Sequence, residues 1–147
     1  MHVHINAILE RERAGLRALM RPSTNLNEGT YMIHQLRIYE IFEHNKAAFH
    51  DRFRDHAARI MKSYGFDIIA TWESKTSDLT EFVYLLAWPD EQTMLRAWGQ
   101  FRADEEWKKI KKLTNTQHGD LVGVIEERTL VPTNYSPSVR RRKPENK

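Results

Sequence analysis

The 147-residue sequence contains no cysteine. That absence excludes disulfide bonds, thiolate zinc sites, iron–sulfur clusters and cysteine nucleophiles, and it fits a reducing compartment, so we expect a cytoplasmic protein. No apolar run approaches the roughly 20 residues that a membrane-spanning helix needs. The Gly-x-Ser-x-Gly, P-loop and Gly-x-Gly-x-x-Gly motifs are also missing, which argues against hydrolases and against nucleotide-triphosphate and dinucleotide binding.

Positive charge is concentrated at the two ends of a chain whose formal net charge is +3. Residues 140–147 hold five basic side chains against one acidic side chain, and residues 1–31 hold four against three, whereas residues 32–139 hold 14 against 16. A basic tail is usually a solvated chain end and only sometimes a tether to nucleic acid or anionic membranes. We therefore predict no nucleic-acid partner and no membrane span.

Three parts of the chain differ in character. Residues 1–31 are an N-terminal extension in which Ala7 to Met20 has the pattern of a short amphipathic helix, stopped by Pro22. This extension packs on the domain or on a partner, stays flexible, or is an upstream-start artefact, because internal methionines could begin translation. Residues 32–131 are the folded domain, and residues 132–147 are a basic, flexible tail.

The domain alternates strand and helix patterns. Apolar residues spaced by three and four from Phe49 to Tyr64 predict a helix that Gly65 ends. A second helical region begins at Asp90 and restarts at Asp104, since an aspartate can cap each helix start. Strands are expected over 33–41, 66–75, 81–88 and 121–131, with a loop over 115–120. This order is the ferredoxin-like βαββαβ arrangement, an α+β fold with a four-stranded antiparallel sheet and two helices on one face.

Strand 33–41 has two different faces, because strand side chains alternate. Leu36 and Ile38 lie on one face, which we expect to anchor the hydrophobic layer under the helices. Gln35, Arg37 and Tyr39 form a polar row on the other face. The strand over 81–88 is apolar on both faces, so something other than the helices must cover the second face. We expect the polar row to face that second, enclosed space.

Four ordered features resemble the NIPSNAP family over about residues 32–131. They are Leu36-Arg37-Ile38-Tyr39 near the domain start; Gly65 followed by a strand bearing Trp72; Tyr84 and Trp88 before a helix with Arg96; and Asp104-Glu105-Glu106-Trp107. One departure is Leu86, where a tryptophan is expected. The resemblance implies a homodimer, a dimeric α+β barrel in which a second copy covers the open sheet face. The family has little assigned chemistry, and its superfamily includes cofactor-free monooxygenases, haem-handling proteins, isomerases and lyases.

The polar row is the strongest candidate site. Gln35, Arg37 and Tyr39, with Trp72 and also Tyr84 or Trp88, are predicted to bind a ligand. The arginine would hold an anion, the phenol would donate a hydrogen bond and the tryptophan would stack on an apolar body. The alternative is an internal ion pair of the arginine with a glutamate at position 40, 73 or 126, which would support the dimer.

The histidines give weaker signals. His56 lies on a shoulder of the first helix, where it is either a base at the cavity edge or a packing residue. No histidine is convincingly aimed at the cavity as a haem ligand, and no group of residues has metal-site spacing, so we predict no metal and no cofactor.

Three functions follow as hypotheses. The first is a homodimer that binds a small, partly apolar, anionic molecule, with catalysis left undecided. The second is a non-catalytic interaction scaffold that acts through the N-terminal helix and the basic tail. The third is an enzyme similar to the cofactor-free monooxygenases.

Overall fold

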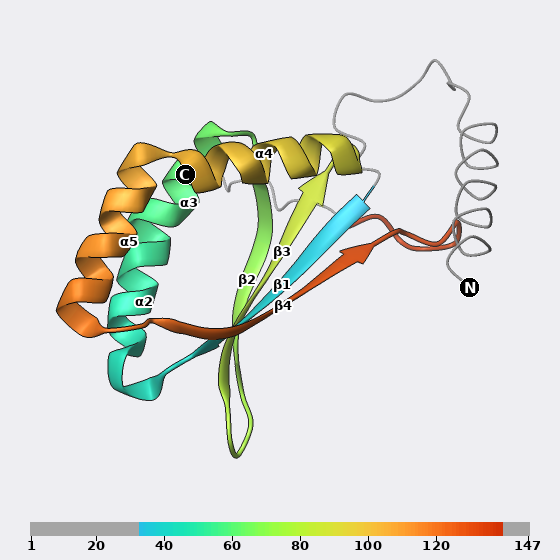
Figure 1. Cartoon of the computed structure of the whole chain (residues 1–147). Coiled ribbons are helices and arrows are strands. Elements are labelled where there is room, and N and C mark those ends of the chain that lie inside the picture. Colours follow the sequence, from blue (N-terminus) through green and yellow to red (C-terminus); the bar gives the residue numbers. More distant parts are fainter. Residues whose placement is uncertain (1–32, 140–147) are drawn as a thin grey trace, which may run out of the picture. The chain divides into compact units, whose positions relative to one another are not determined.

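The computed structural model of the protein describes residues 33–139. The predicted N-terminal extension and the residues after 139 lie outside this part of the chain. The elements follow in the order β1 (Ile33–Ile41), η1 (Glu43–Asn45), α2 (Lys46–Arg52), η2 (Phe53–Ala57), α3 (Ala58–Ser63), β2 (Asp67–Lys75), β3 (Thr80–Trp88), α4 (Glu91–Ala103), α5 (Glu105–His118) and β4 (Val122–Leu130). Figure 1 traces this order, which matches the predicted βαββαβ sequence.

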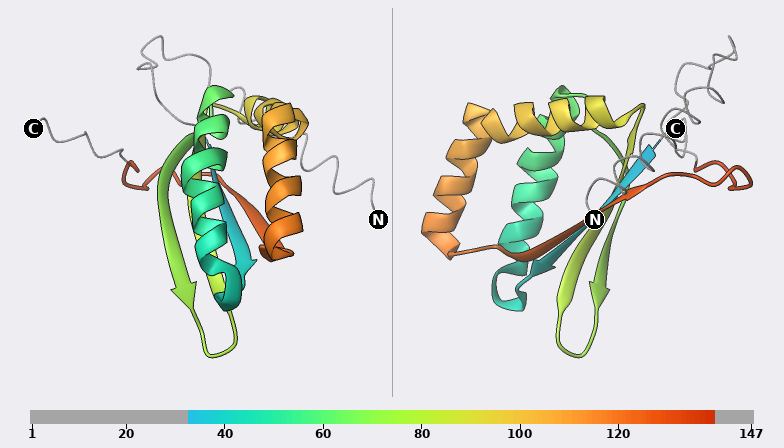
Figure 2. Two further views of the ribbon diagram at one scale, coloured as in Figure 1. Left: turned by 90° about the vertical axis from the view of Figure 1, so that its left-hand side faces the viewer. Right: turned by 45° about the vertical axis from the view of Figure 1, so that its right-hand side comes forward.

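The four strands form one sheet in the order β2-β3-β1-β4, and every pair of neighbours is antiparallel. The helices all lie against one face of this sheet (Figure 2). The α+β, ferredoxin-like prediction is therefore confirmed. In the described residues the opposite sheet face carries no helix, and no helix there is long and apolar enough to cross a membrane.

The first helical region packs the predicted apolar stripe against the sheet. Phe49, Phe53, Ala57 and Ile60 are buried as the spacing required. η2 is one turn of π-helix in the middle of this region, a widened turn of the kind that occurs inside longer helices. Gly65 ends the region with a φ of 88°, a left-handed conformation that glycine adopts without the clash of a Cβ atom.

Two aspartates begin the second pair of helices, as predicted. The Asp90 carboxylate accepts a hydrogen bond from the Thr93 backbone N–H at 2.6 Å. The Asp104 carboxylate accepts from the Trp107 backbone N–H at 2.7 Å and separates α4 from α5. The predicted loop over 115–120 is wrong, because α5 continues to His118 and ends at Gly119 with a φ of 76°.

Asp104 makes the stability of this helix start depend on pH. Its pKa is lowered by the hydrogen bond from the Tyr64 hydroxyl and by the Trp107 backbone N–H. A lowered folded-state pKa gives stability that is present above the ordinary pKa and is lost as pH falls through the folded value. We expect Asp104→Asn to lower the thermal midpoint at pH 7. The difference from wild type should shrink below about pH 4 as the wild-type carboxylate is protonated.

Circular dichroism melts across this pH range measure the effect. Asp78→Asn is the matched control, because Asp78 lies in the exposed turn between β2 and β3 and should change the midpoint little at any pH. A difference for Asp104→Asn that stays constant down to pH 2 would contradict the prediction.

The two faces of β1 are the reverse of the prediction. Tyr39 and Ile41 belong to the buried core under the helices, and Gln35 and Arg37 are buried on the same face. Leu36 and Ile38 are half-buried on the sheet face that the helices leave open. The side chains of β1 alternate as predicted, but the helices cover the row that pairs with Tyr84, Leu86 and Phe82 on β3.

A β-bulge in β2 changes which residues of that strand face the helices. Ile68 pairs with Leu86 on β3, but the register then shifts and Ala70 pairs with Leu85. The extra residue reverses the alternation. Glu73 consequently points to the helices and forms a salt bridge with Lys46 at 2.8 Å, and its neighbour Trp72 points to the open face, where it is 50% exposed.

Candidate functional site

Gln35 organises the floor of the site. Its side chain is completely buried, and its amide oxygen accepts hydrogen bonds from the Nε1 atoms of Trp88 at 2.9 Å and Trp98 at 2.8 Å. Its amide nitrogen donates to a carboxylate oxygen of Glu127. One side chain of β1 thereby fixes two indoles, one on β3 and one on α4, and a glutamate on β4.

Arg37 lies beside Gln35 in the same row and is charge-compensated. Its Nη1 donates to Glu127 Oε2 at 2.8 Å, and its Nη2 donates to the Tyr39 hydroxyl at 3.0 Å. Its guanidinium also lies over the Trp98 ring, 4.3 Å from the centroid. The predicted internal ion pair therefore exists, but its partner is Glu127.

Tyr39 and Tyr84 share a short hydrogen bond between their hydroxyl oxygens, 2.5 Å apart. Tyr84 is completely buried, and burial together with Tyr39 raises its pKa well above the ordinary value of 10.0. Tyr84 therefore stays protonated at neutral pH. Its proton needs an acceptor, and within residues 33–139 the Tyr39 oxygen is its hydrogen-bond partner.

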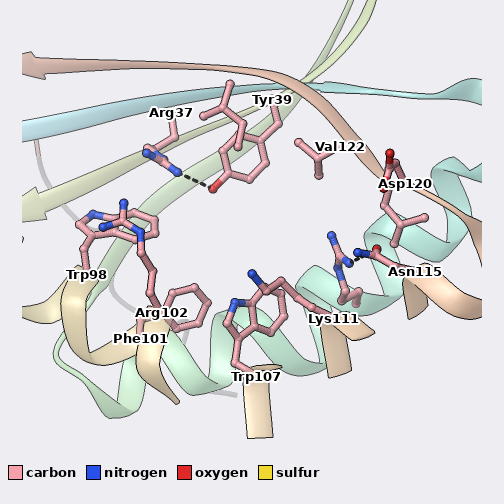
Figure 3. Close-up of a pocket in the computed structure, with 13 residues that line it drawn as sticks. Arg37, Tyr39, Trp98, Phe101, Arg102, Trp107, Lys111, Asn115, Asp120 and Val122 are labelled. Carbon is pink, nitrogen blue, oxygen red and sulfur yellow. Dashed lines mark hydrogen bonds between the residues drawn. The ribbon is translucent and has the colours of Figure 1, made fainter. Parts of the chain in front are cut away.

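A cavity of about 330 Å³ opens between the sheet and the helices (Figure 3). This volume is within the usual range for small-molecule sites. The walls combine aromatic rings, cationic groups and a few other polar side chains. They are formed by Arg37, Tyr39, Arg52, Trp98, Phe101, Arg102, Trp107, Lys111, Asn115, Asp120, Leu121, Val122 and Ile125.

The cavity wall is strongly positive. It holds three arginines and a lysine against the single carboxylate of Asp120. Only Arg37 among these four cations has a carboxylate within salt-bridge distance in the described part of the chain. The others contact aromatic rings: Arg102 lies 5.2 Å from the Trp98 centroid, and Arg52 and Lys111 lie 5.5 Å and 5.9 Å from that of Trp107.

The NIPSNAP family model matches residues 34–137, which is most of the chain. The chain belongs to the NIPSNAP family. None of the curated proteins matches it.

Solved structures of NIPSNAP proteins share the fold. An uncharacterised NIPSNAP-like domain protein from Burkholderia xenovorans has 20% identity and a TM-score of 0.63, and the alignment covers 79% of this chain and 98% of that one. A NIPSNAP family protein of unknown function from Agrobacterium tumefaciens has 20% identity and a TM-score of 0.61, with 76% and 96% covered. A second NIPSNAP family protein from that organism has 19% identity and a TM-score of 0.62, with 71% and 96% covered.

The NIPSNAP domain brings only part of the predicted site together. Arg37 and Tyr39 line the cavity, and Gln35, Tyr84 and Trp88 lie buried beneath it. The expected position of Trp72 beside the row is wrong, because the bulge places it on the open face. His56 lies in η2 and is not among the residues that line the cavity.

Several cavity residues of this NIPSNAP domain were not predicted as site residues. They are Trp98, Trp107, Arg52, Arg102 and Lys111. One signal was available in the sequence, because Trp98 precedes Arg102 by four residues and Trp107 precedes Lys111 by four. Residues four apart lie on the same helix face, so both helices carry a cation beside a tryptophan.

Proposed function

We propose that this NIPSNAP domain binds a small, partly apolar, anionic molecule in the cavity between the sheet and the helices. The observation that carries the proposal is the set of Arg52, Arg102 and Lys111, three cations without a carboxylate partner in residues 33–139, around one aromatic-walled cavity. Arg52 is buried and has lost hydration, so its charge needs compensation, whereas Arg102 and Lys111 are exposed and add to the positive potential of the cavity wall. A bound anion supplies that compensation, and the rings offer contact to its apolar part.

A fluorescent anion tests this function on the full chain. 1-Anilinonaphthalene-8-sulfonate carries an aromatic body and one fixed negative charge, and N-phenyl-1-naphthylamine is nearly the same molecule without the charge. We expect saturable binding of the sulfonate, seen as a fluorescence increase, and weaker binding of the amine. The double variant Arg102→Gln/Lys111→Gln should raise the dissociation constant of the sulfonate about tenfold, because it removes two charge interactions of modest strength.

The control removes the same charge outside the cavity. Lys109→Gln/Lys112→Gln changes two exposed lysines of α5 that do not line the cavity, and it should change the dissociation constant less than twofold. Equal effects of the two double variants, or equal affinity for the charged and the neutral probe, would contradict an anionic ligand.

We also propose that the domain is a homodimer through its open sheet face. Leu36, Ile38, Val83 and Leu85 are half-buried there, and Trp72 is 50% exposed beside them. A contiguous apolar face on paired strands is typical of an interface. A second copy is a suitable cover, since the same face then meets itself across a two-fold axis. The scaffold hypothesis rests mainly on residues 1–31 and on the basic tail, most of which lie outside the described part.

A further inference from the structure

Arg52 is the buried cation of the cavity that has no carboxylate partner in residues 33–139. It comes from the end of α2, is only 8% exposed, and its Nη1 donates to Thr114 Oγ1 at 3.0 Å and to Asn115 Oδ1 at 3.3 Å on α5. Both acceptors are neutral. Its Nε and Nη2 have no hydrogen-bond acceptor among residues 33–139. Burial lowers the pKa of this guanidinium, but an arginine stays charged at neutral pH.

Arg37 is a poorer candidate for an anion, although it lines the same cavity. Glu127 already neutralises its charge, and Tyr39 takes a second N–H group. A second anion at Arg37 would meet the Glu127 carboxylate. Arg52 is therefore the buried cation that lacks a negatively charged partner in residues 33–139, and Lys111 lies beside the same Trp107 ring.

The two arginines mark different ends of the cavity. Figure 3 places Arg37 and Trp98 at one side and Asn115 and Asp120 at the opposite side, and Arg52 bonds to Asn115. Asp120, the one carboxylate that lines the cavity, makes no salt bridge with Arg52 or Lys111. Trp107 and Phe101, whose rings stack with centroids 5.0 Å apart, form an apolar wall of the cavity.

Tyr39 offers a proton to the cavity. Its oxygen accepts from Arg37 Nη2 at 3.0 Å. Either oxygen could donate in the hydrogen bond between the Tyr39 and Tyr84 hydroxyls. We assign the donated proton to Tyr84, because its hydroxyl is completely buried and has no other acceptor in residues 33–139. With its oxygen accepting two hydrogen bonds, the proton of Tyr39 is left for a group in the cavity.

We infer that the ligand is a flat apolar molecule with a carboxylate at one end, held by Arg52 and Lys111, and a neutral oxygen acceptor at the other end, which receives the Tyr39 hydroxyl proton. This inference rests on the proposed function and adds the ligand's polarity. A carboxylate is favoured because its two oxygens match the two free N–H positions of a guanidinium in a planar, bidentate contact.

Isothermal titration calorimetry of three naphthalenes with the full chain tests the carboxylate end and the carbonyl end of the proposed ligand separately. 6-Acetyl-2-naphthoate carries both groups, 2-naphthoate carries only the carboxylate, and 2-acetylnaphthalene carries only the carbonyl. Arg52→Met should raise the dissociation constants of both naphthoates roughly 10- to 100-fold and leave that of 2-acetylnaphthalene within threefold. Tyr39→Phe should raise the constant of 6-acetyl-2-naphthoate about two- to tenfold and leave that of 2-naphthoate unchanged.

The control is Arg96→Met, which makes the same substitution at an exposed arginine of α4 that does not line the cavity. It should change both naphthoate affinities less than threefold. A larger effect at Arg102→Met or at Arg37→Met than at Arg52→Met would overturn the inference and leave the proposed function intact. Failure of both naphthoates to bind the wild-type protein would contradict the inference and the proposed function. Thermal melts check that each variant is folded, and a loss of stability at Arg52→Met with unchanged naphthoate affinity would make Arg52 a structural residue only.

Discussion

Replacing Gln35 with leucine is expected to lower the free energy of unfolding by about 2–4 kcal/mol, although leucine fits a buried position and has a similar size. Gln35 is completely buried and has three hydrogen-bond partners. The substitution leaves the indole N–H groups of Trp88 and Trp98 without an acceptor inside the protein. Each unsatisfied buried donor costs about 1–3 kcal/mol, and the apolar gain of leucine offsets only part of this.

Urea unfolding followed by tryptophan fluorescence measures the change, and Gln100→Leu is its control. Gln100 is an exposed glutamine of α4, so the same chemical change there should stay within about 0.5 kcal/mol of wild type. A Gln35→Leu variant as stable as Gln100→Leu would show that the indoles find other acceptors. The prediction would then be wrong, and Gln35 would not be the residue that fixes the floor of the site.

A glutamate in place of Leu85 is expected to convert the proposed dimer to a monomer. Leu85 lies on β3, where it pairs with Leu36 on β1 and with Ala70 on β2, so it is near the middle of the open face. Burying an unpaired carboxylate costs several kcal/mol. An isologous interface carries the change twice. We expect the dissociation constant of the dimer to rise at least 100-fold, since each 1.4 kcal/mol is tenfold.

Sedimentation velocity over a concentration series measures this directly. Leu95→Glu is the matched control, because Leu95 is 61% exposed on α4, away from the sheet. That variant should stay as dimeric as wild type. Trp72→Glu is a second interface variant whose side chain contributes little to the fold of one chain, so its effect separates dissociation from unfolding. A monomeric wild type, or interface variants that remain dimeric, would refute the proposed assembly.

The order of elements could be predicted because its signals are local. Asp90 and Asp104 cap helices with their own carboxylates a few residues from the N–H groups they bind, and Gly65 supplies a left-handed conformation at a single position. Such signals act within one turn of the chain. These signals can therefore be recognised in the sequence without knowing which helices and strands pack together.

The choice of face could not be predicted from alternation alone. Along β3, Tyr84 alternates with Val83 and Leu85, and both sets are apolar, so the pattern does not say which set meets the helices. The decision depends on long-range packing. Gln35 accepts from Trp98, which is 63 residues away, and this contact turns the polar row toward α4.

The cavity depends on several distant segments at once. Arg52 reaches Thr114 and Asn115 across more than 60 residues of sequence. The pairing of tryptophan with a cation four residues later was visible on each of the two later helices. Both pairs line the same cavity because the chain bends at Asp104. The buried arginine of α2 joins them because α2 packs against α5.

The bulge in β2 also has a genetic meaning. Ile69 is the residue that the register of β2 and β3 skips, and the two halves of the strand are out of phase by that one residue. Deleting the codon for Ile69 would leave a regular ladder in which Trp72 still pairs with Val83 on the open face and Glu73 still pairs with Phe82 beneath the helices. A change of one residue in chain length at this position would therefore leave both faces of the sheet, and the proposed assembly, as they are.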